Sequence, residues 1–166
     1  MIESMTDFSP AELIKRTHTH LNQYITSADQ KMSILLTAHL AFIGLYGGRV
    51  SEVWMGSSID FKTAVTATLI SGTVAASLAA WVIYPRNSQG EEDGLMFWGS
   101  IVEYEQSEFV SEFGDLDDEA ALDELIQQNH SLARVADSKY EYTRCALIAT
   151  AVTVGFAAAS AGLFFF

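Results

Sequence analysis

The chain has 166 residues and a formal net charge of −12, with 21 acidic against 9 basic side chains. This acidic balance argues against nucleic-acid binding and against adhesion to anionic lipid headgroups, because both of those surfaces are polyanionic. Cys145 is the single cysteine, which excludes a disulfide framework and a thiolate metal site. The mean hydropathy is nevertheless positive, at +0.19, so apolar and acidic residues must be separated into blocks.

The first predicted element is a long helix that starts near residue 10. Ser9 suits the N-cap, Pro10 the first helical position and Glu12 the third, where a glutamate closes a capping box. The next helix breakers are Gly47 and Gly48, so one helix of about 38 residues is expected. An apolar stripe with heptad-like spacing predicts that this helix packs against a partner helix. The stripe consists of Ile14, Leu21, Ala28 and Leu35.

This helix is expected to lie in the cytoplasm over residues 1–31 and to form the first transmembrane helix over residues 32–48. A span needs about 20 apolar residues to cross about 30 Å of hydrocarbon, so the first span is marginal in length. His39 lies inside it, and titratable groups in a span usually face other helices because lipid does not solvate them. Its role is either a hydrogen bond between helices or a proton or gating site.

Residues 49–62 are expected to form an external loop, and residues 63–85 the second transmembrane helix. Small side chains recur every four residues in this span and again in residues 145–166, the predicted third transmembrane helix. Such ladders let helix backbones approach closely, either within one bundle or in a homo-oligomer. The residues predicted for this packing are Gly72, Ala76, Gly155 and Ala159.

Residues 86–144 form an acidic cytoplasmic region that is expected to be helical, with 15 acidic and 4 basic side chains. It is predicted to contain a loop over Pro85–Gly94, an amphipathic element over Leu95–Glu112, and a long helix that begins at Asp118 and continues into the third span. The predicted fold class is therefore an all-α membrane protein with three transmembrane helices. The first and third extend as long cytoplasmic helices that pack together.

The basic residues predict the orientation in the membrane. Seven of them lie before the first span or between the second and third spans, and two lie in the loop after the first span. The positive-inside rule therefore places the N-terminus and residues 86–144 in the cytoplasm, with the chain as a multi-pass protein of the inner membrane.

Polar residues near the entry to the first span predict a juxtamembrane ion-pair layer. These residues are Asn22, Asp29 and Lys31. Lys139 and Arg144 lie at an equivalent depth on the helix that leads into the third span, so pairing between the two helices is expected.

Catalysis and metal binding are not predicted. His18 and His20 are two positions apart, which on a helix points the side chains about 200° apart and prevents them from sharing one ion. No serine, cysteine or carboxylate pair has a recognisable nucleophile or acid–base setting. We therefore expect neither an enzyme nor a metal site nor a cofactor.

Several short motifs occur in order along nearly the whole chain. They are Asn22 with Ala28-Asp29-Gln30-Lys31, Tyr84-Pro85-Arg86, Leu95-Met96-Phe97-Trp98-Gly99, and Leu132-Ala133 with Lys139-Tyr140 and Arg144. Together they resemble the transmembrane effector family of Pycsar anti-phage systems. Trp98 departs slightly from the family's more usual double phenylalanine before glycine. The resemblance implies that a cyclase makes a pyrimidine cyclic mononucleotide, cyclic CMP or cyclic UMP, during phage infection. It also implies that the effector then impairs the inner membrane and halts the cell.

The sequence contains no separate nucleotide-binding domain, so a ligand would bind the cytoplasmic helices themselves or a partner would sense it. Arg86, Lys139 and Arg144 are the cations at motif positions, and they are the candidates for binding the cyclic phosphate. The alternative function is a non-conducting membrane scaffold or receptor subunit, whose acidic cytoplasmic face docks a basic partner.

Overall fold

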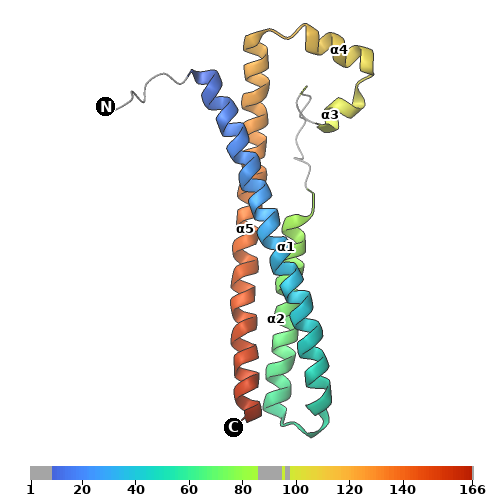
Figure 1. Cartoon of the computed structure of the whole chain (residues 1–166), viewed down its shortest axis with the longest axis vertical. Helices are drawn as coiled ribbons and strands as arrows, with labels where there is room; N and C mark the ends of the chain where they lie inside the picture. The colour runs from blue at the N-terminus through green and yellow to red at the C-terminus, as the bar shows by residue number, and fades with distance from the viewer. Residues whose placement is uncertain (1–8, 86–94, 96–97, 166) are drawn as a thin grey trace, which may run out of the picture. The chain divides into compact units, whose positions relative to one another are not determined.

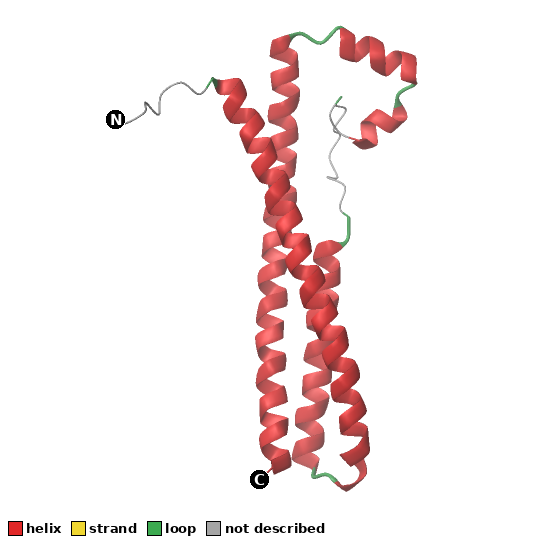
Figure 2. Cartoon of the chain, in the orientation of Figure 1, coloured by secondary structure: helices red, strands yellow, loops and turns green. Residues whose placement is uncertain are grey.

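The computed structural model describes residues 9–85, 95 and 98–165, and over these residues it consists of helices and short turns (Figure 1, Figure 2). The helices are α1 (Pro10–Val53), a short 3-10 helix η1 (Trp54–Gly56), α2 (Ile59–Ile83), α3 (Trp98–Glu103), α4 (Gln106–Gly114) and α5 (Asp118–Phe165). Within the described part of the chain, three helical segments are long and apolar enough to cross a membrane. They are Pro10–Gly56, Ile59–Ile83 and Asp118–Phe165. The predicted fold class, with three membrane-length helices, is confirmed.

The chain divides into two compact units. The polar unit comprises residues 1–25 and 86–137, and the span unit comprises residues 26–85 and 138–166. Both α1 and α5 contribute their N-terminal parts to the polar unit and the remainder to the span unit, whereas α2 belongs to the span unit alone.

Helix α1 begins at its predicted cap. The Glu12 amide donates to Ser9 Oγ at 3.2 Å, as an N-cap requires. The Glu12 carboxylate accepts from Arg16 at 3.0 Å, one turn further along α1. At the start of α5, the Ala120 amide donates to Asp117 Oδ1 at 2.8 Å, and the helix then continues without a break to Phe165.

The predicted end of α1 at Gly47 and Gly48 is wrong, because the helix continues to Val53. Glycine weakens a helix in water by about 1 kcal/mol per residue. In an apolar environment, however, breaking the backbone hydrogen bonds costs several kcal/mol per group, so the helix persists. The turn to α2 is accordingly confined to Trp54–Ser58, and most of residues 49–62 is helical.

The element expected over Leu95–Glu112 is two short helices, α3 and α4, which are separated at Tyr104 and Glu105. The ring of Phe109 lies near those of Tyr104 and Phe113, at 6.2 Å and 5.9 Å between centroids. The predicted loop over Pro85–Gly94 lies outside the described residues except for Pro85.

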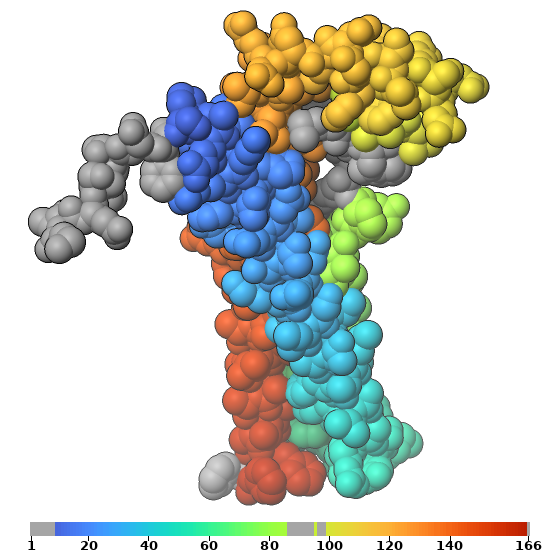
Figure 3. Space-filling view, turned by 45° about the horizontal axis from the view of Figure 1, so that its top comes forward, coloured from blue at the N-terminus to red at the C-terminus, as the bar shows by residue number. Residues whose placement is uncertain are grey.

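In the span unit, α1, α2 and α5 lie side by side, and α1 and α5 form one face of it with α2 mostly behind them (Figure 3). Tyr46 contacts Ser160 while Asp29 contacts Lys139, so α1 and α5 run parallel. Phe61 near the start of α2 lies against Phe164 near the end of α5, so α2 is antiparallel to both. Two clusters of buried residues form the core. They are Met32, Ala79, Val82 and Ala146, and Val50, Phe61 and Val65.

Candidate functional site

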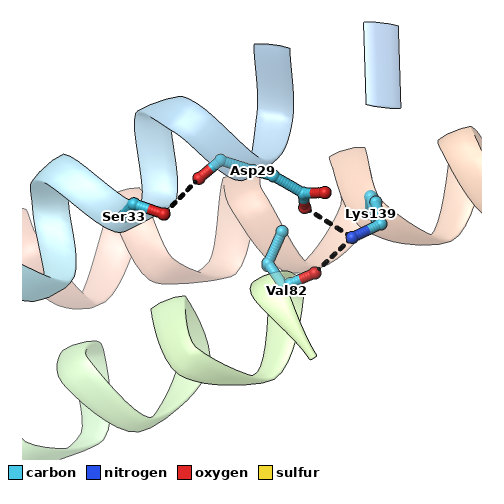
Figure 4. A network of polar contacts seen from close by, with 4 residues as sticks. All are labelled: Asp29, Ser33, Val82 and Lys139. Atoms are coloured by element: carbon cyan, nitrogen blue, oxygen red, sulfur yellow. Dashed lines mark hydrogen bonds and ion pairs between the residues drawn. The ribbon is translucent and has the colours of Figure 1, made fainter. Parts of the chain in front are cut away.

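The main polar feature of the span unit is a buried lysine that links three helices (Figure 4). Lys139 of α5 is only 3% exposed. Its ammonium donates to the Asp29 carboxylate of α1 at 2.5 Å and to the Val82 carbonyl of α2 at 2.6 Å. Ser33 Oγ donates to the backbone carbonyl of Asp29 at 2.8 Å, so it leaves the carboxylate to Lys139. We call Asp29, Val82 and Lys139 the junction.

Each partner in the junction compensates part of the cost of burying the ammonium. Val82 lies in the last turn of α2, where backbone carbonyls have no partner within the helix and where the helix dipole favours a cation. The Asp29 carboxylate supplies the opposite charge, and its side chain is 34% exposed. Removing one member of such a pair leaves the other charge without compensation, so the junction depends on all three groups.

The juxtamembrane ion-pair layer was predicted from Asn22, Asp29 and Lys31, and the structure places these three residues in settings that differ from one another. Asp29 pairs with Lys139 across the two helices. Lys31 is exposed, and the exposed Asn22 donates to the His18 carbonyl within α1 at 3.1 Å.

The three candidates for phosphate binding also lie in different settings. Lys139 is buried in the junction, whereas Arg144 is exposed on α5. Arg86 lies outside the described residues, as does Phe97 of the aromatic motif. Whether any of these cations binds a nucleotide stays a prediction.

His39 of α1 is 5% exposed, and its Nδ1 donates to the Leu35 carbonyl of the same helix at 2.9 Å. The ring lines an apolar cleft of about 410 Å³ between α1 and α5, together with Phe42 and Thr153. The hydrogen bond that the structure gives His39 is therefore within its own helix.

The small residues of the two predicted ladders separate into two groups. Gly72 and Ala76 of α2 are buried inside the span unit. A Cβ at Gly72 would lie 3.4 Å from Thr153 and 3.5 Å from Ile43, so three helices meet closely there. In contrast, Gly155 and Ala159 of α5 are exposed, and a Cβ at Gly155 would have no neighbour within 4 Å.

The sequence interpretation missed a buried asparagine in the polar unit. Asn129 of α5 is 8% exposed. Its Oδ1 accepts from His18 Nδ1 at 3.1 Å, and its Nδ2 donates to the Ile14 carbonyl at 3.0 Å. The available signal was a polar residue inside an apolar helical stripe, which often fixes the register of packed helices.

Among the described residues, no three histidine, cysteine or carboxylate side chains come together in a way that could hold a metal ion. Among the described residues of the polar unit, carboxylates outnumber lysine and arginine side chains.

Comparison with known proteins adds independent information. Residues 13–166 match the family described as the Pycsar effector protein domain. The chain is also 30% identical over 141 residues to the Pycsar effector protein SaPycTM of Staphylococcus aureus, which covers 85% of this chain and 87% of that protein. No solved structure matches.

The match extends over almost the whole chain and includes the three membrane-length helices and the junction residues. It confirms the resemblance that the motifs predicted, and this is not a known enzyme family. The chain belongs to the Pycsar effector family, the transmembrane effectors of cyclic-nucleotide anti-phage systems.

Proposed function

We propose that this chain resides in the inner membrane and, when a cyclic nucleotide signals phage infection, impairs membrane integrity and halts the cell as abortive infection. The proposal rests on one observation. The chain belongs to an effector family, and it has three membrane-length helices whose apolar side chains point outward. Ile34, Leu45, Ile70 and Val154 are 72%, 75%, 61% and 63% exposed, and lipid would cover them.

The packing of the span unit favours damage that involves more than one protomer. Gly72 is surrounded by Ile43 and Thr153, so the centre of the three helices is filled by side chains at that level. A conducting path would then run between protomers of a homo-oligomer, or the helices would disturb the lipid directly. Gly155 and Ala159 provide an exposed small-residue surface for contact with a second protomer.

The proposed signal is cyclic CMP or cyclic UMP made by a cognate cyclase. With the N-terminus and residues 86–144 in the cytoplasm, as the distribution of bases favours, a soluble nucleotide reaches the polar unit and the nearby cations. Arg144 is exposed and able to receive a phosphate, whereas Lys139 would first have to leave Asp29. The chain acts without a cofactor and without enzymatic chemistry of its own.

A specific observation supports the scaffold as a second function. Val102 of α3 and Val110 and Phe113 of α4 are 76%, 64% and 58% exposed on a strongly acidic segment. A basic, partly apolar partner would suit this surface, and a scaffold of that kind would bind it without damaging the membrane.

Two measurements test the proposal. Expression together with a cognate cyclase is expected to collapse the membrane potential and to let in a dye that intact cells exclude. An unchanged membrane potential and unchanged dye exclusion would favour the scaffold. Calorimetric titration of cyclic CMP and cyclic UMP into the detergent-purified chain is expected to show saturable binding. That binding should be lost in an Arg86→Ala and Arg144→Ala double variant and retained in Arg49→Ala, which removes an arginine from the opposite side of the membrane.

A further inference from the structure

The position of the junction along the chain distinguishes it from an ordinary ion pair. The chain passes between the polar unit and the span unit three times, after Ile25, after Pro85 and after Asp137. Asp29, Val82 and Lys139 each lie within one helical turn of a different crossing. Residues close to all three crossings are therefore linked through one shared ammonium group.

The junction selects one arrangement of the three helices but contributes little to their net stability. A buried ion pair contributes little net stability compared with apolar packing, but it strongly favours the one arrangement in which both charges are compensated. Here a single ammonium links a carboxylate on α1 with the carboxyl-terminal end of α2. Displacing α1 relative to α5 at this level removes the carboxylate partner of the ammonium, and displacing α2 removes its carbonyl partner.

From this we infer that the junction is a latch. Its contacts stabilise the inactive arrangement of the span unit, here called the quiet state, and activation breaks these contacts. This inference rests on the proposed function and names its regulation. The nucleotide does not need to touch the latch. It needs only to bind more tightly to the arrangement in which the latch is open, because a ligand shifts an equilibrium only by its differential affinity for the two states.

The latch predicts activity without any signal when either charge is removed. Truncating one partner of a buried pair shifts such an equilibrium by about tenfold to a hundredfold, with the lower value suited to the partly exposed Asp29. The charge-conserving variant Asp29→Glu keeps a carboxylate beside the ammonium and leaves the Val82 carbonyl in place, so it should keep the quiet state. A contact that merely supports folding would lower the amount of inserted protein and would not produce signal-independent activity.

The test uses the full chain in lipid vesicles that contain a self-quenched dye. Wild type, Asp29→Asn, Lys139→Met and the charge-conserving Asp29→Glu are compared at equal inserted protein, with and without cyclic CMP or cyclic UMP. Lys31→Met and Glu141→Gln are matched controls, because both remove an exposed charge within a short distance along the same helices. The expected result is at least tenfold faster dye release without nucleotide for Asp29→Asn and Lys139→Met, and near wild-type release for Asp29→Glu and the controls.

Asp29→Asn and Lys139→Met variants that stay as quiet as wild type would overturn the latch, whatever the nucleotide does to wild type. If Asp29→Glu released dye as fast as Asp29→Asn, the latch would be overturned as well, because the carboxylate would then not matter. If wild type fails to respond to either nucleotide while Asp29→Asn and Lys139→Met leak, the latch stands and the direct response to nucleotide fails. If Lys139→Met does not insert, Asp29→Asn decides alone, because the amide is isosteric with the carboxylate and the side chain is partly exposed.

Discussion

Substitution of Gly72 by a larger residue gives a quantitative test of how the three helices pack. A Cβ at this position would meet Thr153 Cγ2 at 3.4 Å and Ile43 Cγ1 at 3.5 Å, which is ordinary van der Waals contact. Gly72→Ala should therefore change the free energy of unfolding by no more than about 1 kcal/mol. Gly72→Leu places further carbons where these neighbours already lie, and such overpacking costs about 1 to 3 kcal/mol.

Gly155→Leu is the matched control, because it makes the same change in a spanning helix where a Cβ would have no neighbour within 4 Å. Its effect on the unfolding of one protomer should stay within about 0.5 kcal/mol. The assay is reversible unfolding in mixed micelles by titration with a denaturing detergent, followed by tryptophan fluorescence. If Gly72→Leu were as stable as Gly155→Leu, the close approach of α2 to the other two helices would be refuted.

Three further predictions concern other contacts. Tyr46→Phe should lower the unfolding free energy by about 0.6 kcal/mol and by at most about 1.7 kcal/mol, the average and the maximum found for hydrogen bonds between spanning helices. Ser160 Oγ donates to a backbone carbonyl, so the Tyr46 hydroxyl is the donor at 2.6 Å, and Ser160→Ala added to Tyr46→Phe should cost little more in the same titration. Asn129→Ala removes hydrogen bonds to His18 and to the Ile14 carbonyl and should destabilise the polar unit by about 2 kcal/mol, seen as faster hydrogen exchange there. Unchanged hydrogen exchange in the polar unit of this variant would contradict the prediction. Gly155→Leu, although neutral for the protomer, should slow nucleotide-triggered dye release if protomers associate through this face, and full release would exclude that contact.

The parts of the fold that were predictable from sequence depend on local patterns. The start of α1 at Pro10 follows from the capping residue Ser9, and the start of α5 at Asp118 follows from its acidic first turn. The spans follow from long uncharged runs. Gly47 and Gly48 were interpreted with rules for helices in water. The helix continues through them, because an apolar environment makes broken backbone hydrogen bonds more costly than glycine in a helix.

The candidate site was only partly predictable, because its partners are distant in sequence. Asp29 and Lys139 were both expected near the membrane, but their direct pairing over 110 residues depends on the register of α1 and α5. The Val82 carbonyl could not be predicted, since every residue has a backbone carbonyl and only the end of α2 leaves this one available. Asn129 was missed for the same reason, because its partners come from α1.

Dye release from vesicles that contain the purified wild-type chain tests the central claim most directly. The account predicts slow release in the absence of nucleotide and a saturable increase when cyclic CMP or cyclic UMP is added. If correctly inserted protein released no dye with either nucleotide, a membrane-impairing effector that responds directly to these signals would be contradicted.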